Sequence, residues 1–160
     1  MSNERTVTAQ AGQQTIAFSR AFDAPAAAVF EAHTDAGLLA RWVGPRGTQL
    51  RVRALDARTG GCWSWVVEGL GGAWAFHGSF HEVSAPHRIV QTFEHDDEPG
   101  SPTLEVLTFV DLGGGRSRLD GLSVFLSVED RDAMLAGMDG GMDENFRRLD
   151  DLLATPAPAR

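Results

Sequence analysis

The sequence predicts an α+β fold in which a curved antiparallel sheet of seven strands wraps around a long C-terminal helix. From about residue 48 to about residue 125, apolar side chains recur at every second position, which is typical of strands. Turns rich in glycine and proline divide this region into six consecutive strands, and such short connections make neighbouring strands antiparallel. The next segment returns to helical spacing, and only this helix is large enough to cover the apolar face of the sheet.

Two short helices are expected between the first strand and the other six. Residues 13–22 alternate weakly and predict the first strand. Pro25 suits the first turn of a helix over residues 26–33. Asp35 is a suitable N-cap for a second helix over residues 36–42, which the following Gly-Pro pair ends.

One domain is expected over residues 13–154. Residues 1–12 are polar and residues 155–160 carry the prolines that end the last helix, so both ends are expected to be flexible.

Aromatic side chains gather on one side of the middle strands. Trp63 and Trp65 share a side of one strand, and Trp74, Phe76 and Phe80 share a side of the next. Alternating rings of this kind either fill a core or line a pocket, and their spacing alone favours the core.

The hairpin at residues 84–87 sets the predicted register of its two strands. If Val83 pairs with Arg88, Glu82 faces Ile89. The same register places His77 beside Glu94 on the outer face of the sheet. On the concave face it gathers the apolar residues Phe76, Phe80, Ile89 and Phe93.

The C-terminal helix is predicted over residues 128–153, with Ser127 as its N-cap. Its middle is unusual in carrying three glycines (Gly137, Gly140, Gly141) and methionines at every fourth position (Met134, Met138, Met142). Glycines there indicate that bulk is unwelcome, either because the sheet comes close or because space is kept free. Methionine adapts to irregular shapes, so an apolar cavity opposite the aromatic strands is one interpretation.

Composition excludes several functions. The net charge of −8 argues against binding to nucleic-acid phosphates or to anionic membranes. The single cysteine, Cys62, allows no internal disulfide, and no apolar run is long enough to span or enter a membrane. We therefore expect a cytoplasmic protein without membrane insertion and without a nucleic-acid partner.

No metal or other cofactor is expected. His77 and His81 lie four residues apart on one strand, or about 13 Å, too far to share a zinc ion. The sequence also has no phosphate-binding or dinucleotide-binding glycine loop.

Catalytic residues are not identified by any motif, and the sequence leaves open whether the protein is an enzyme. The candidates are polar groups expected on the concave face: Glu82, Gln91 and His95, with Glu144 or Asn145 on the helix. A carboxylate or imidazole among apolar rings has a perturbed pKa suited to proton transfer.

Four passages resemble one bacterial family. They are RWVGPRG (41–47), DARTGGCWSW (56–65), FHGSFHEVSAPHRIVQTFE (76–94) and SVFLSVEDRDAMLAGMDGGMDENFRRLDDLL (123–153). Together they resemble the AHSA1-type family (Activator of Hsp90 ATPase homologue 1-like) of the START/Bet v 1-like (SRPBCC) superfamily. The resemblance implies a helix-grip fold of order β-α-α-β6-α with a cavity between sheet and helix. The ligand-binding residues expected there are Trp63, Trp65, Trp74, Phe76, Phe80, Phe93, Met138 and Met142.

Three functions follow from this interpretation. The first is binding of a small hydrophobic or aromatic molecule as carrier or sensor. The second is a cofactor-free enzyme of the cyclase (polyketide cyclase-like), dehydratase or lyase type. The third is an Hsp90 co-chaperone, as the family name suggests. The eukaryotic co-chaperone has a further N-terminal domain for which 160 residues leave no room, so an Hsp90-type partner is not expected. A homodimer is left open.

Overall fold

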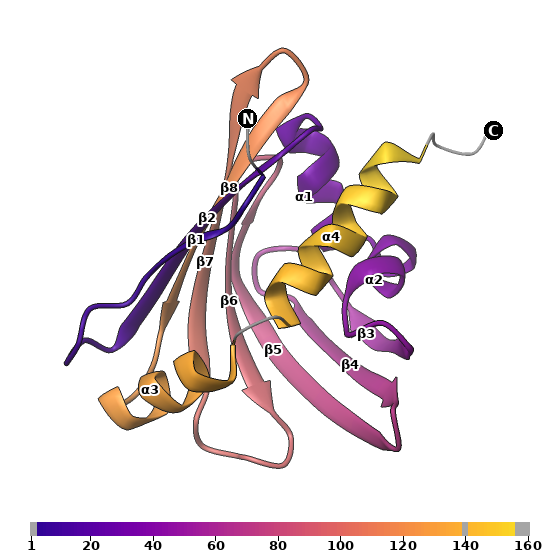
Figure 1. The fold of residues 1–160 in the computed structure, drawn as a ribbon. Helices are drawn as coiled ribbons and strands as arrows, with labels where there is room; N and C mark the ends of the chain where they lie inside the picture. The colour runs from indigo at the N-terminus through magenta and orange to yellow at the C-terminus, as the bar shows by residue number, and fades with distance from the viewer. Residues whose placement is uncertain (1–2, 139–140, 156–160) are drawn as a thin grey trace.

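The structure, a computed structural model, describes residues 3–138 and 141–155. Within these residues an eight-stranded antiparallel sheet curves around helix α4, with strand order β1-β2-β8-β7-β6-β5-β4-β3 (Figure 1). The strands are β1 (Thr6–Thr8), β2 (Thr15–Phe22), β3 (Thr48–Leu55), β4 (Cys62–Gly69), β5 (Gly72–Ser84), β6 (Arg88–His95), β7 (Thr103–Gly113) and β8 (Arg116–Val124). The helices are α1 (Ala26–Thr34), α2 (Ala36–Trp42), α3 (Val128–Gly137) and α4 (Gly141–Ala154). The predicted α+β fold is confirmed.

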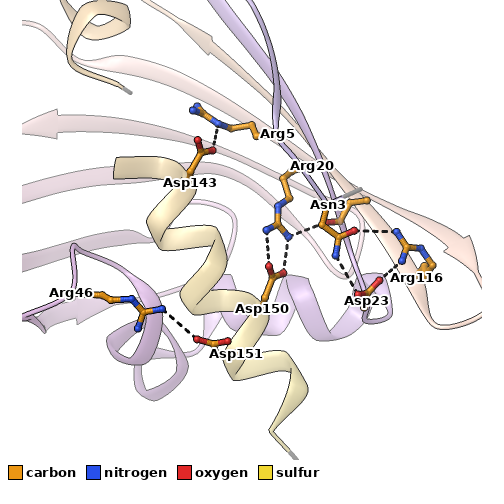
Figure 2. Close-up of polar contacts among 10 residues, drawn as sticks. Asn3, Arg5, Arg20, Asp23, Arg46, Arg116, Asp143, Asp150 and Asp151 are labelled. Carbon is orange, nitrogen blue, oxygen red and sulfur yellow. Dashed lines mark hydrogen bonds and ion pairs between the residues drawn. The ribbon is translucent and has the colours of Figure 1, made fainter. Parts of the chain in front are cut away.

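The sheet has eight strands rather than the seven predicted, because part of the N-terminal segment joins it. Residues 6–8, expected to be flexible, form β1 and pair with residues 17–19 of β2. Asn3, just before β1, donates a hydrogen bond to Asp23 and accepts one from Arg116 (Figure 2). Strand pairing and these contacts supply the attachment that the polar composition of residues 1–12 does not reveal.

The two short helices match their predicted bounds to within one residue. Pro25 immediately precedes α1. The Asp35 carboxylate accepts a hydrogen bond of 2.9 Å from the Leu38 amide and so caps α2, as predicted. No helix among the described residues is both long and apolar enough to cross a bilayer.

The C-terminal helix is broken, so the single helix predicted over 128–153 is wrong. Ser127 caps α3 by accepting a hydrogen bond from the Asp130 amide, as predicted. However, α3 ends at Gly137 and α4 begins at Gly141, and the two run in different directions (Figure 1). A Cβ built at either glycine would meet no atom within 4 Å. Close approach of the sheet therefore does not explain these two glycines, whereas their low helix propensity explains the break. Gly140 lies outside the described residues.

The predicted hairpin register holds on one side of a β-bulge and fails on the other. Phe80 pairs with Gln91, and His77 pairs with Glu94, as expected. Between Phe80 and Glu82 the register shifts by one residue, so Glu82 opposes Val90 and not the predicted Ile89. Because cross-strand partners share a face, the bulge turns Glu82 away from the concave side.

Two aromatic rings lie flat on glycines of the neighbouring strand. Trp63, 1% exposed, covers Gly78, where a Cβ would come within 2.5 Å of the indole nitrogen. Phe18 covers Gly121 in the same way, with its ring 2.0 Å from a Cβ built there. Each glycine gives a large ring a place close to the sheet, and the Phe18 ring also contacts Phe146 of α4, with ring centres 5.7 Å apart.

Two ion pairs join α4 to the first strands (Figure 2). Arg20 on β2 is 6% exposed and donates to both carboxylate oxygens of Asp150, each at 2.6 Å. Its guanidinium also lies 4.6 Å from the centre of the Phe22 ring. Arg5, next to β1, donates to Asp143 at 2.8 Å. The two pairs connect the first and third turns of α4 to the β1–β2 side of the sheet.

On its other side α4 is attached to the connection between α2 and β3. The Glu144 carboxylate accepts a hydrogen bond from the Arg46 amide at 2.7 Å, and Arg148 donates to the Gly44 carbonyl at 2.6 Å. The Arg46–Asp151 pair is longer, at 3.4 Å, and both side chains are mostly exposed (Figure 2). Phe146 and Leu149 enter the core between these two rows of polar contacts.

Neighbouring carboxylates on α4 provide a matched test of the buried pair. Asp150→Asn should lower the free energy of unfolding by about 2 to 3 kcal/mol, because it leaves the buried Arg20 without its counter-charge. Asp151→Asn should change it by less than about 0.5 kcal/mol, because its partner is exposed. Urea denaturation of both variants measures the difference, and equal losses would contradict the assigned role of Arg20.

The glycine under Trp63 gives a second stability prediction. Gly78→Ala should destabilise the protein by about 3 kcal/mol, because its Cβ would lie 2.0 Å from the Thr92 carbonyl oxygen and against the indole. Gly137→Ala is the control. It places a methyl group in open space at the end of α3 and should leave stability unchanged or raise it by up to about 1 kcal/mol. Thermal denaturation compares the two, and a tolerated Gly78→Ala would show that Trp63 does not depend on this glycine.

Candidate functional site

A cavity of about 500 Å³ lies between the concave face of the sheet and helices α3 and α4. Its walls are mainly apolar, and ligand sites commonly have volumes of this order. Three of the residues that line it are also well exposed: Leu70 (69%), Trp74 (39%) and Met134 (45%). The cavity therefore opens between the β4–β5 hairpin and α3, which lie on either side of the start of α4 in Figure 1.

A second, inner chamber of about 190 Å³ extends toward α1 and α2. It shares seven lining residues with the outer chamber: Phe18, Val43, Trp65, Phe93, Glu105, Met142 and Asn145. The two chambers are thus adjoining parts of one space, and these seven residues surround the point where they meet.

Most residues expected to bind a ligand lie on these walls. The outer chamber includes six of them: Trp65, Trp74, Phe76, Phe93, Met138 and Met142. Phe80 lines the inner chamber. Trp63 lines neither, because its ring lies flat on Gly78 and is covered by Trp65, whose ring centre is 4.0 Å away. Trp63 is therefore a core residue, and the ligand contact expected of it is not supported.

Among the described residues, one carboxyl group faces the cavity, at a position not among the predicted candidates. Glu105 on β7 lines both chambers. It pairs across the sheet with Gln91 on β6 and with Ser123 on β8, so these three polar side chains form a row across three strands. Gln91 Nε2 donates a hydrogen bond to Glu105 Oε1 at 2.9 Å, and Asn145 on α4 lines the same space.

The sequence carried a signal for Glu105, but an ambiguous one. Glu105 alternates with Thr103, Leu107 and Phe109 along β7. The opposite side of the strand is just as apolar, with Leu104 and Val106 among its residues. Alternation therefore did not reveal which face was concave. Only the register with Gln91 identifies it.

Burial raises the pKa of Glu105, and the hydrogen bond from Gln91 offsets part of this effect. The Glu105 side chain is half-buried, and its exposed part faces the cavity and not the outer surface of the protein. Apolar walls solvate an ionised carboxylate poorly, which is why burial is the main cause of the raised pKa.

His33 on α1 is the other titratable residue on the cavity walls within the described part of the chain. Burial lowers its pKa to about 4, so its imidazole is neutral at physiological pH. His33 Nδ1 lies 2.7 Å from the Val29 carbonyl oxygen, which can only accept, so Nδ1 carries the proton. His33 Nε2 is therefore left as a hydrogen-bond acceptor. The ring lies edge-on to Trp42 and Phe109 beside the inner chamber.

Of the catalytic candidates predicted from the sequence, Gln91 and Asn145 line the cavity, whereas Glu82, His95 and Glu144 do not. Glu82, turned outward by the bulge, accepts a hydrogen bond from Ser84 and pairs with Arg88. His95 packs edge-on against Phe76, and its Nδ1 accepts from the Asp97 amide. Neither lines a chamber. Of the three strand candidates only Gln91 does, and Glu144 is engaged by the Arg46 amide.

His77 forms the outer pair predicted for it. His77 Nε2 lies 3.2 Å from Glu94 and Nδ1 lies 2.7 Å from Asp96, which raises the pKa of this histidine, chiefly through the hydrogen bond to Asp96. Over the described residues, no group of three or more His, Cys, Asp or Glu side chains is placed to hold a metal ion.

The raised pKa of Glu105 predicts a pH-dependent stability. A carboxyl whose pKa is higher in the folded state than in the unfolded state binds its proton more tightly when folded. Stability is therefore lost as pH rises from the ordinary carboxyl range through the folded pKa. Between pH 5 and pH 8 the wild type should lose stability relative to Glu105→Gln, which cannot ionise.

Glu31→Gln, at an exposed position on α1, is the control and should show the pH dependence of the wild type. Urea denaturation at the two pH values checks this, and parallel behaviour of wild type and Glu105→Gln would contradict it.

Solved structures with the same fold come from several bacteria. A crystal structure of a Rhodobacter sphaeroides protein superposes with a TM-score of 0.85 at 27% identity, covering 94% of this chain and 99% of that one. A Chromobacterium violaceum protein gives 0.78 at 26% identity, covering 89% and 99%. The AHSA1 protein of Silicibacter pomeroyi gives 0.71 at 25% identity, covering 88% and 97%. No curated protein matches this chain.

The family described as "Activator of Hsp90 ATPase homolog 1-like protein" matches residues 23–154, from the end of β2 to the end of α4. The matched region contains α1, α2, all of the strands β3–β8 and both parts of the C-terminal helix, and the sequence resemblance is confirmed. The chain belongs to the AHSA1 family.

Proposed function

We propose that this protein binds a small hydrophobic or aromatic molecule in the cavity between the sheet and helices α3 and α4. The observation that carries the proposal is the outer chamber itself, about 500 Å³ and lined mainly by aromatic, aliphatic and methionine side chains. A space of this size with few polar groups is typical of sites for small ligands, in which the apolar walls supply affinity and the polar groups supply orientation.

The wall residues suit an aromatic ligand. Trp65, Phe76 and Phe93 line the outer chamber on the sheet side, with ring centres of Phe76 and Phe93 5.1 Å apart. Met138 and Met142 face it from the helical side, and the flexible thioether chain of methionine adapts to different contours. The site therefore favours a flat, mainly aromatic molecule.

A cofactor-free enzyme of the cyclase, dehydratase or lyase type is the second candidate. Glu105 and the neutral His33 favour it, because they place a proton donor and a proton acceptor on the wall of the inner chamber. Incubating protein with its co-purified ligand, followed by mass spectrometry of the extract, separates the two candidates. An unchanged compound indicates a carrier, and conversion that Glu105→Gln abolishes indicates an enzyme. The Hsp90-related role and the cytoplasmic location stay predictions.

Neighbouring residues of β8 allow a sharp test of cavity binding. Ser123 points into the outer chamber, whereas Leu122 is 38% exposed on the opposite face. Wild-type protein should increase the fluorescence of N-phenyl-1-naphthylamine, a neutral apolar probe. Ser123→Phe should weaken that binding at least tenfold by filling the cavity, and Leu122→Phe should leave it unchanged. Equal binding by both variants, or none by the wild type, would refute the proposal.

A further inference from the structure

The polar row on the cavity wall is placed where a ligand would meet it. Gln91, Glu105 and Ser123 are direct cross-strand neighbours at the centre of the sheet, and Glu105 lines both chambers at the point where they meet. Apolar rings lie to either side, Phe93 on β6 and Phe18 on β2. An apolar molecule that fills the cavity therefore passes directly over Glu105.

Glu105 has no cationic partner on the cavity wall. The described residues that line the two chambers include no arginine, and the chain has no lysine. Two arginines are buried on elements that border the cavity, Arg20 on β2 and Arg131 on α3, and neither lines a chamber. Both terminal nitrogens of Arg20 are held by Asp150, and Arg131 donates to Asp132 and to the Thr15 carbonyl. The Gln91 amide supplies one hydrogen bond to Glu105 Oε1. A single neutral donor does not replace the solvation that an ionised carboxylate loses on burial, so burial raises the pKa of Glu105 and favours its neutral acid over the ionised form.

A neutral carboxyl group has one proton to donate. Gln91 donates the hydrogen bond that it shares with Glu105, so the carboxyl proton of Glu105 stays available to a ligand. Ser123 and Asn145 can either donate or accept, and so complete a polar spot that can hold one oxygen atom of a ligand.

We propose that the ligand of this cavity is a neutral, mainly aromatic molecule with a carbonyl oxygen that accepts a hydrogen bond from the protonated carboxyl group of Glu105. This inference rests on the proposed ligand-binding function and specifies the class of ligand. Apolar walls bind the ring system, and Glu105 recognises the oxygen and fixes the orientation of the molecule.

An aromatic ammonium ion is the competing ligand class, since aromatic rings also attract cations. It would require an ionised Glu105 before binding, and the groups facing Glu105 do not favour that form. Gln91 faces it from β6, Ser123 from β8, and Asn145 from α4, and none of these carries a charge. His33, the other titratable wall residue, is neutral at the pH of the experiment below.

Three probes of matched shape test the assignment: 2-acetylnaphthalene, 2-ethylnaphthalene and 1-(2-naphthyl)ethylamine. Binding is measured by quenching of tryptophan fluorescence and by isothermal titration calorimetry from pH 5 to pH 9. At pH 5 the ketone should bind wild-type protein about five- to tenfold more tightly than the hydrocarbon, the contribution of one hydrogen bond. This preference should fall as pH rises and the carboxyl group ionises. The hydrocarbon should show less pH dependence.

Two variants separate the donor from its charge. Glu105→Gln keeps an N–H donor, so it should keep the preference for the ketone but lose the pH dependence. Glu105→Leu removes the donor, so the ketone and the hydrocarbon should bind equally. Binding of the hydrocarbon to each variant shows that the cavity is intact.

The possible outcomes distinguish this inference from the proposed function. If the hydrocarbon binds and the ketone shows no preference, Glu105 does not recognise a carbonyl and only this inference fails. If the ammonium probe binds most tightly and Glu105→Gln abolishes that binding, the ligand class is wrong. If none of the three probes binds, the proposed function fails, and this inference fails with it.

Discussion

The bidentate pair between Arg20 and Asp150 fixes the position of α4, on which the rest of the structure depends. The two residues are 130 positions apart and meet at 2.6 Å, with the arginine buried and the aspartate partly exposed. A fork of two parallel charged hydrogen bonds fixes direction as well as distance, which an apolar contact does not. Phe146, one turn before Asp150, is thereby held against Phe22 in an edge-on contact with ring centres 5.5 Å apart. The beginning of α4, with Met142 and Asn145, is consequently held above the concave face.

A helix attached in this way does not need to fill the space beneath it. Its polar contacts lie along its sides, with Arg5 and Arg20 on one side and the residues around Gly44 on the other. On the sheet, Trp63 and Phe18 lie over glycines of the neighbouring strand, and of the two only Phe18 contacts a ring of the helix, that of Phe146. Ion pairs and hydrogen bonds along its sides, together with the core packing of Phe146 and Leu149, thus hold the helix in place, while its beginning stands over the cavity.

Sequence patterns predicted the parts of this architecture that depend on local chemistry. Alternation located seven of the eight strands, and the caps Asp35 and Ser127 correctly marked the starts of two helices.

The three predictions that failed each required non-local information. β1 has only three residues and is defined by its partner strand. The bulge before Glu82 reversed the orientation expected from regular alternation. The glycines near residue 140 were interpreted as leaving room for the sheet or for a cavity within one continuous helix, whereas the helix is broken there. Glu105 was missed for a similar reason, since both faces of β7 are apolar.

Glu105 is difficult to explain as a structural residue. An acid on an apolar wall is destabilising once it ionises, and glutamine or leucine at this position would remove that disadvantage. Departures from the local rules of folding concentrate at functional sites, where stability is sacrificed for chemistry. A carrier needs only the donor, Glu105. An enzyme that moves a proton also needs an acceptor, and His33 Nε2, held in the correct tautomer by the Val29 carbonyl, provides one on the inner chamber. The two functions therefore differ in whether the ligand reaches past Glu105 into the inner chamber as far as His33.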